Sequence, residues 1–375
     1  MTNKKVIAAG HICLDITPLF PAGKTGRTED LLIPGKLLRM DGVDVHTGGP
    51  VANTGLAMKK LGADVRLMGK IGDDAFGRMI LDILAGYGCD GRRDMIIDPN
   101  AVTSYSVVLA MPGSDRIFLH APGANDTFSS ADLDMKAVSE ADLFHFGYPP
   151  LMRRMYENDG AELVTVFKTV KELGLATSLD MSAVDPSSDA GKVDWYGILE
   201  RLMPYVDFFL PSAEELCFML DRDRWEEWMS RCHGGDVTET LEAERDIRPL
   251  ADMLMDMGAG VVLIKCGAPG LYYRTADVKR LSEIGAKVDI EPTLWADREG
   301  FKKSYVPEKI CSATGAGDTC IAAFLTAMLG GRDPESCIRL AAAAGASCVE
   351  GYDALSGLKS MDELEKKIAA GWAER

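Results

Sequence analysis

The segment that decides the fold is Ser312-Ala313-Thr314-Gly315-Ala316-Gly317-Asp318-Thr319-Cys320, which directly precedes an apolar stretch. The three small residues at its centre leave the backbone bare, so a turn formed there can bring N–H groups close to an anion. Apolar residues then recur at helical spacing, at Ile321, Phe324, Leu325 and Met328. We therefore expect a buried helix from about Asp318 to Leu329 that starts at an anion-binding turn, an arrangement typical of phosphoryl transfer.

Asp318 itself allows two interpretations. A carboxylate in the first turn of a helix is favoured by the helix dipole and can serve only to cap free N–H groups. Glycine-rich turns are also common in segments that bind no ligand. The segment alone leaves both a cap and an anion-binding site open, so a second motif has to decide.

Further motifs occur along the rest of the chain. They are Gly10-His11-Ile12-Cys13-Leu14-Asp15, Gly48-Gly49-Pro50-Val51-Ala52-Asn53, residues 69–77, Gly123-Ala124-Asn125, Pro211-Ser212-Ala213-Glu214-Glu215 and Lys265-Cys266-Gly267-Ala268-Pro269-Gly270. Together with the 312–320 segment, and in this order, they resemble the ribokinase-like (PfkB) carbohydrate kinase family. The resemblance extends over most of the chain.

Short β-prone runs alternate with helical ones, which predicts an α/β fold with a largely parallel sheet and ligands at the carboxyl ends of its strands. The expected core strands are residues 5–13, 65–68, 143–146, 176–179, 208–210 and 261–265. The resemblance implies a ribokinase-like three-layer α/β/α architecture in a single kinase domain, 1–375. It also implies a small β lid from about 16–46 and 99–122, where the β-prone pieces 31–46 and 103–120 lie outside the alternation.

Composition excludes several other classes of protein. The 375 residues are 47% hydrophobic, enough for a large core, yet no stretch is long and apolar enough to span a membrane. Nine cysteines without a CxxC pair favour neither a disulfide framework nor a zinc site and fit a reducing cytoplasm. A formal charge of −16 argues against nucleic acid as a partner.

The resemblance implies a role for each residue of the glycine turn. Asp318 would act as the base that accepts the proton of the attacking hydroxyl. The backbone N–H groups of Gly315, Ala316 and Gly317 would form the anion hole. A carboxylate with an ordinary pKa near ~3.9 is a weak base for an alcohol, so Asp318 is expected to act late in the transfer and to orient the nucleophile.

The resemblance also assigns the sugar contacts, to Asp15, Gly48, Gly49 and Asn53. An acid, bare backbone and an amide supply the mixed donors and acceptors that vicinal hydroxyls require. Two of these residues have a simpler interpretation. Asp15 could cap a turn before Pro18, and Asn53 could be the N-cap of a helix over 52–61.

ATP and Mg²⁺ are the cofactors that the resemblance implies. Glu215 matches the glutamate that holds the magnesium through water, although Ser212 stands where asparagine is usual and Glu214 is a competing ligand. The nucleotide phosphates would be lined by Lys265, Gly267, Gly270 and Thr314, with the small-residue helix 341–348 near the adenine. Ser312 replaces the aspartate of potassium-activated relatives, which puts activation by K⁺ in doubt.

The sequence therefore predicts an ATP-dependent kinase that phosphorylates a monosaccharide or sugar acid, acts with sugar and ATP as its small-molecule partners and forms a homodimer. A nucleoside kinase of the same fold and a non-catalytic sugar sensor are the alternatives. Arg116 in the lid could meet a phosphate on the substrate. The charged stretch 221–248 is expected to form solvated helices on the rim, and 277–304 has no assignable chemistry.

Overall fold

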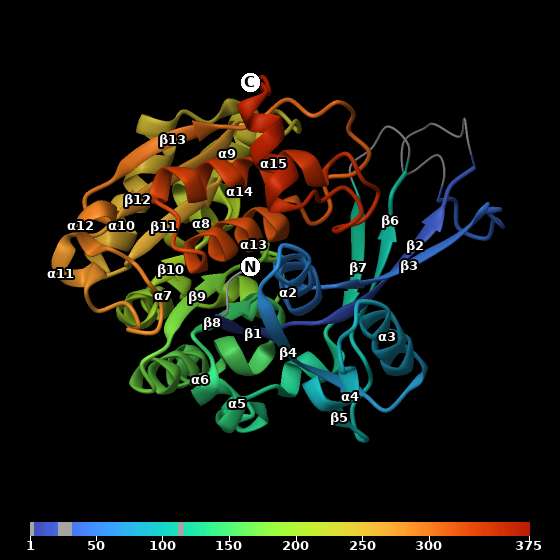
Figure 1. Ribbon diagram of the computed structural model, residues 1–375. Coiled ribbons are helices and arrows are strands. Elements are labelled where there is room, and N and C mark those ends of the chain that lie inside the picture. Colours follow the sequence, from blue (N-terminus) through green and yellow to red (C-terminus); the bar gives the residue numbers. More distant parts are fainter. Residues whose placement is uncertain (1–3, 22–31, 112–115) are drawn as a thin grey trace.

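In the computed structural model, which describes residues 4–21, 32–111 and 116–375, the strands form two separate sheets (Figure 1). The larger sheet has nine strands in the order β13-β12-β11-β10-β9-β8-β1-β4-β5. Its seven parallel strands are β1 Lys5–Gly10, β4 Asp64–Gly72, β5 Met95–Asp98, β8 Leu143–Gly147, β9 Ala176–Asp180, β10 Phe208–Phe209 and β11 Val261–Lys265. At one edge, β12 Gly270–Thr275 and β13 Glu299–Lys303 pair antiparallel. The predicted α/β class and mostly parallel sheet are confirmed.

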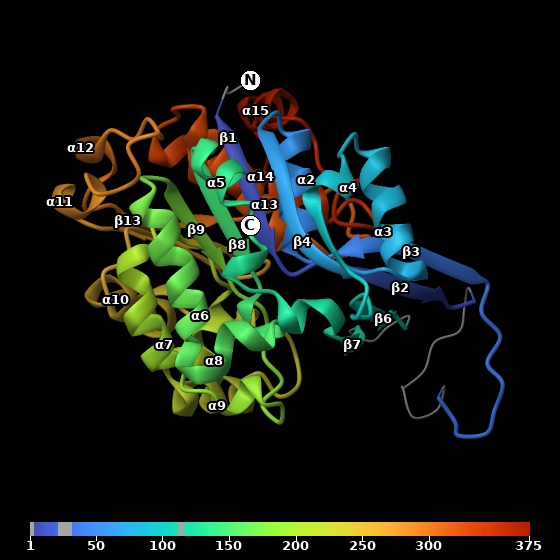
Figure 2. The same ribbon diagram turned by 90° about the horizontal axis from the view of Figure 1, so that it is seen from below.

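Helices cover both faces of this sheet because each parallel strand alternates its apolar side chains between two cores (Figures 1 and 2). In β1, Val6 and Ala8 enter one hydrophobic core, whereas Ile7 and Ala9 enter the other. The first core is covered by α2 Pro50–Lys60, α3 Ala75–Gly86, α13 Ala316–Leu329, α14 Pro334–Cys348 and α15 Met361–Ala369. The second is covered by α5 Met135–Glu140, α6 Arg153–Glu172, α7 Trp195–Leu202, α8 Ala213–Leu220, α9 Arg222–Arg231 and α10 Arg248–Asp256. The three layers match the predicted α/β/α architecture.

The smaller sheet is formed by β3-β2-β6-β7 and extends away from the large sheet on the right of Figure 1. Its strands are β2 Cys13–Leu19, β3 Gly42–Gly48, β6 Tyr105–Leu109 and β7 Ile117–Ala121. The predicted first strand was too long: β1 ends at Gly10, where φ is 118°, and the chain enters the smaller sheet at Cys13. Of the predicted lid, residues 22–31 and 112–115 lie outside the described residues.

The stretch 221–248 is less solvated than predicted. It contains α9, but Trp228 on this helix is completely buried in the second core, so one face of the helix packs against the protein. The stretch 277–304 forms the short helices α11 Val278–Leu281 and α12 Pro292–Trp295 and the edge strand β13. The remaining short helix, α4, spans Gly91–Asp94. Among the residues that the structure describes, no helix is both long and apolar enough to cross a membrane.

Candidate active site

The glycine turn is where the chain enters helix α13. Gly315 is the N-cap and has the left-handed conformation, with φ at 75°. A Cβ atom on Gly315 would lie 2.2 Å from Cβ of Ala354, in the loop after α14, so neither its conformation nor its surroundings suit another residue. The helix spans Ala316–Leu329, and all its residues from Asp318 onward are buried. The predicted helix is confirmed, starting two residues earlier than expected.

Asp318 lies at the bottom of this turn with only 4% of its surface exposed. Its carboxylate accepts hydrogen bonds from three side chains. The amide of Asn53 donates to Oδ2 at 3.1 Å, and the hydroxyls of Thr54 and Tyr148 donate to Oδ1, each at 3.1 Å. Asn53 and Thr54 come from α2, whereas Tyr148 follows β8 in a left-handed conformation with φ at 64°. The carboxylate is thus held in one orientation by two separate segments.

Burial raises the pKa of the Asp318 carboxyl group above its ordinary value, although Lys265 and the three hydrogen bonds oppose this shift. The same burial, together with the charge of Asp318, raises the pKa of Tyr148 well above its ordinary value. Tyr148 is therefore a neutral donor at physiological pH. A carboxylate whose proton affinity is increased by burial is better suited to accept a proton than an exposed one.

Lys265 places a cation beneath the turn. It is the last residue of β11, and its Nζ donates to Oδ1 of Asp180 at 2.7 Å, while a Cβ on Gly317 would lie 3.5 Å from that Nζ. Asp180 ends β9 and is buried, and its burial raises its own pKa. Burial alone would lower the pKa of Lys265, but the negative charges of Asp180, Glu215 and Asp318 outweigh it and raise that pKa. The ammonium group therefore stays charged.

Glu215 belongs to a capping box at the start of α8. Its Oε2 accepts from the backbone N–H of Ser212 at 2.9 Å, and the Ser212 hydroxyl accepts from the backbone N–H of Glu215 at 3.4 Å. Ser212 thus caps the helix. The backbone N–H of Ser212 binds one of the two carboxylate oxygens of Glu215.

Two predicted nucleotide contacts, Gly267 and Gly270, also meet local packing needs. Gly267 has a φ of 63°, and a Cβ on it would lie 2.5 Å from Oγ1 of Thr238. Gly270 has a φ of 142°, and a Cβ on it would lie 2.1 Å from the carbonyl oxygen of Lys302. Thr314 accepts a hydrogen bond from Arg116, which directly precedes β7 of the smaller sheet. The Ser312 hydroxyl donates to the Thr314 hydroxyl at 3.0 Å.

The predicted sugar contacts lie where the smaller sheet meets α2. Asp15 is in β2, and its carboxylate packs against Gly48, where a Cβ would be 2.4 Å from Oδ2. The two simpler interpretations are wrong: Asp15 lies within a strand rather than at a turn cap, and the N-cap of α2 is Gly49 rather than Asn53. Asn53 was predicted as a sugar contact, and in the structure its amide donates a hydrogen bond to Asp318.

Sequence reasoning missed Thr54, Tyr148 and the two histidines His11 and His120. The histidines lie close together near Gly49, with their ring centroids 5.1 Å apart. Thr54 follows Asn53 directly and could have been inferred from that neighbour, because both lie at the start of one helix. Tyr148 and His120 carry no local signal, since only the fold brings them to Asp318 and His11.

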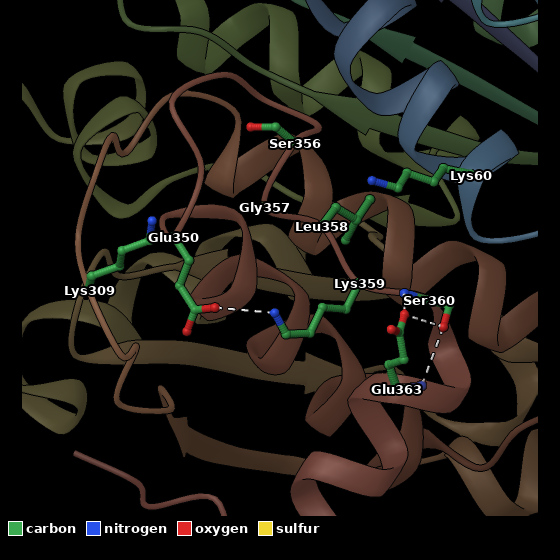
Figure 3. A pocket seen from close by; sticks show the side chains of 9 residues that line it. All are labelled: Lys60, Lys309, Glu350, Ser356, Gly357, Leu358, Lys359, Ser360 and Glu363. Atoms are coloured by element: carbon green, nitrogen blue, oxygen red, sulfur yellow. Dashed lines mark hydrogen bonds and ion pairs between the residues drawn. The ribbon is translucent and has the colours of Figure 1, made fainter.

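A cavity of ≈480 Å³ is lined mainly by residues of the loop before α15 and by the start of that helix (Figure 3). Lys60, from α2, donates there to the carbonyl oxygen of Leu355 at 2.8 Å, and Lys359 pairs with Glu350 at 3.3 Å. Its lining does not include Asp318, Lys265 or Glu215, and is formed by Lys60, Lys309, Glu350, Ser356, Gly357, Leu358, Lys359, Ser360 and Glu363. The cavity is therefore separate from the cluster around Asp318.

Comparison with known proteins gives three consistent results. Residues 13–361 match the model of the family described as "pfkB family carbohydrate kinase". An uncharacterised sugar kinase of Archaeoglobus fulgidus is 25% identical and covers 82% of this chain and all of its own length. A ribokinase of Arabidopsis thaliana is 26% identical and covers 86% of this chain and 72% of its own.

Solved structures share the fold over nearly the whole chain. The structure of Arabidopsis thaliana ribokinase with ribose and ATP superposes with a TM-score of 0.68 at 20% identity and covers 98% of each chain. The structure of a putative ribokinase II from E. coli with ATP and Mg²⁺ gives a TM-score of 0.70 at 21% identity and covers 98% of this chain and 99% of its own. At this level of identity the likeness establishes the ribokinase fold.

Proposed function

We propose a specific reaction for this chain, which belongs to the pfkB family of carbohydrate kinases and is thus a phosphotransferase with an alcohol acceptor. It transfers the γ-phosphoryl group of MgATP to a hydroxyl of a monosaccharide or sugar acid, and Asp318 is the base. One observation carries the proposal: a buried carboxylate, oriented by three donors, lies in the first turn of a helix beside a bare glycine turn and a buried lysine.

The proposed chemistry follows from this arrangement. Phosphoryl transfer needs the acceptor hydroxyl in line with the phosphorus and compensation for the charge on the phosphoryl oxygens. Asp318 orients the hydroxyl and takes its proton as the new P–O bond forms. The N–H groups of Gly315, Ala316 and Gly317 donate to the phosphoryl oxygens, and the Lys265 ammonium beneath them adds positive charge.

Glu215, Lys265, Gly267, Gly270 and Thr314 are proposed to hold the nucleotide and its metal. Bound Mg²⁺ would neutralise phosphate charge and take hard oxygen ligands. In residues 4–21, 32–111 and 116–375, no group of three or more His, Cys, Asp or Glu side chains could hold a metal ion. We propose that magnesium would enter with the nucleotide, held by phosphate oxygens and water, with Glu215 as an anchor; one solved structure of this fold contains ATP and Mg²⁺.

The smaller sheet is proposed as the lid, within a single kinase domain. The contact of Arg116 with Thr314 supports this role, because it links the outer sheet to the glycine turn. A lid would exclude water, which otherwise competes with the sugar for the phosphoryl group. Val43, Phe118 and Leu119 are more than half exposed on these strands. Exposed apolar side chains on the two outer strands of the sheet, β3 and β7, support the predicted homodimer.

The proposal is tested by ADP release from MgATP over a panel of neutral sugars, sugar acids, phosphosugars and nucleosides. A kinase of this kind gives saturable, sugar-dependent release. Preference for a nucleoside would support the alternative nucleoside kinase. Saturable sugar binding without ADP release across the panel would support a sugar sensor and contradict the proposal.

Replacing Tyr148 with phenylalanine should move the acid limb of kcat/KM to higher pH. The Tyr148 hydroxyl stabilises the charged carboxylate, so its removal raises the pKa of Asp318 further. Asp318 must be deprotonated to act, hence activity is lost as pH falls through its pKa. A hydrogen bond to a charged group contributes about 1.5 kcal/mol, which predicts a shift of roughly one pH unit.

The measurement is kcat/KM as a function of pH for the parent and the variant. Tyr196→Phe, on the exposed side of α7, serves as the control and should leave the profile in place. An acid limb that is unchanged in Tyr148→Phe, or that moves to lower pH, would argue against Asp318 as the titrating base.

Replacing Lys265 with methionine should destabilise the protein and raise the KM for ATP. The change leaves the Asp180 carboxyl group buried without its partner, and breaking a buried ion pair from one side costs about 3 kcal/mol or more. Urea denaturation measures this loss. The double variant Lys265→Met/Asp180→Asn should recover part of the stability but not the KM for ATP, and equal recovery of both would show that Lys265 is only structural.

A further inference from the structure

Two histidines close to Asp318 have no part in the mechanism above. His11 lies in the turn between β1 and β2, and His120 lies on β7 of the smaller sheet. Three of their ring nitrogens are buried, namely Nδ1 and Nε2 of His11 and Nε2 of His120. None of the three has a hydrogen-bond partner among the described residues. His11 is only 2% exposed. Because buried polar atoms are normally paired, these nitrogens indicate a missing polar ligand.

Contacts link the pair to Asp318, the proposed base, and to Asp15, the acid of the proposed sugar site. On one side, the His11 ring is 6.2 Å from the ring of Tyr148, whose hydroxyl donates to Asp318. On the other, Nδ1 of His120 lies 3.0 Å from the Ser106 hydroxyl, which contacts the Cys13 thiol at 3.9 Å, and that thiol donates to Oδ1 of Asp15 at 3.3 Å.

Gly49 brings His11 against the start of α2. A Cβ on Gly49 would lie 2.6 Å from Nδ1 of His11, so any larger residue would displace the imidazole. Gly49 was assigned to the sugar site because its bare backbone permits close approach. The structure adds that the same glycine leaves room for the ring of His11.

The chemistry of the pair favours hydroxyl groups. Burial lowers the pKa of His11 well below its ordinary value, with a further contribution from His120, and burial also lowers the pKa of His120. A neutral imidazole offers one N–H donor and one acceptor nitrogen. A hydroxyl group likewise donates and accepts, whereas a carboxylate or phosphate group can only accept.

The surrounding charges disfavour an anionic substrate. The carboxyl groups that act on this region are Asp15, Asp318 and, at His120, Asp126. Of the cations, Lys265 acts on Asp318 and is paired with Asp180, and Arg116 donates to the Thr314 hydroxyl in the glycine turn. A carboxylate or phosphate bound beside the histidines would therefore face like charge at both ends.

We propose that His11 and His120 form a specificity site that recognises hydroxyl groups of a neutral, unphosphorylated sugar or polyol. This inference rests on the proposed kinase function and narrows it, since that proposal leaves sugar acids and phosphorylated substrates open.

The test uses His120→Asn and His11→Asn in the full chain. At position 120, asparagine keeps a polar atom near Nδ1 for Ser106 and removes Nε2. Each variant should raise the KM for the preferred neutral sugar about tenfold or more, as expected for the loss of a hydrogen bond to a buried group, and leave the KM for ATP within about twofold. His233→Asn, in an exposed turn, is the matched control and should change neither constant.

Several results would overturn the inference while the kinase function stands. One is a parent enzyme that prefers a sugar acid, a phosphosugar or a nucleoside. Another is an unchanged sugar KM in both folded histidine variants. If one variant fails to fold, the other variant and the substrate preference of the parent still test the inference.

If no substrate gives ADP release, the kinase function fails, and sugar binding still tests the inference. Thermal stabilisation of the parent by neutral sugars, weaker in His120→Asn and unchanged in His233→Asn, would support it. Stabilisation by acidic sugars alone, or none by neutral sugars, would contradict it.

Discussion

Replacing Asp318 with asparagine is expected to lower kcat by about two to four orders of magnitude, the range that a positioned general base contributes in other enzymes. The amide is close in shape to the carboxylate but cannot accept the hydroxyl proton. Initial rates of ADP release at saturating sugar and MgATP measure the loss.

The fold should tolerate this change. Burial raises the pKa of Asp318, which means that the charged carboxylate is disfavoured in its buried position, and a neutral amide removes that cost. The melting temperature should therefore not fall substantially. Asp73→Asn, an exposed acid in the turn before α3, is the matched control and should keep full activity. A folded Asp318→Asn variant with kcat within tenfold of the parent would exclude Asp318 as the base.

Replacing Gly315 with alanine is the second change with a large expected effect. The added methyl group would lie 2.2 Å from Cβ of Ala354, and alanine would have to adopt a φ of 75°. The turn must shift, which displaces the N–H groups that we propose as the anion hole. Loss of one such donor lowers kcat by about 10²–10³ in other enzymes, so we expect at least that loss here.

Gly174 offers a matched control for the backbone strain. It has a φ of 76°, almost the same as Gly315, but nothing lies within 4 Å of a Cβ placed there. Gly174→Ala should therefore lose about 1 kcal/mol of stability from strain and retain its kcat. If Gly315→Ala shows only that same loss of stability and keeps its activity, the turn is not the anion hole.

The sequence predicted the local parts of the site well. Helix α13 was expected over 318–329 and spans 316–329. The prediction was accurate because the apolar spacing and the glycines at both ends of the helix all lie within one short segment of sequence. The strand ends were less accurate. The expected first strand ran to Cys13 because apolar residues resume after Gly10 and His11, and their pattern does not show that they belong to a different sheet.

Contacts between distant segments were beyond sequence reasoning. The motif around Asn53 predicted a sugar contact but not the hydrogen bond that its amide donates to Asp318, 265 residues further along the chain. Tyr148 and His120 gave no signal at all, because a single tyrosine or histidine is ordinary until the fold places it beside Asp318 or His11. The resemblance to a family supplied roles for residues that match its motifs and none for residues outside them.

The most direct test of the central claim is identification of the phosphorylated product. After incubation with MgATP and the best sugar of the panel, ³¹P NMR and mass spectrometry of the sugar fraction should show one phosphate monoester on the sugar, formed in equal amount to ADP. ADP that accumulates with inorganic phosphate and an unmodified sugar would contradict the claim, because it would show that the phosphoryl group passes to water.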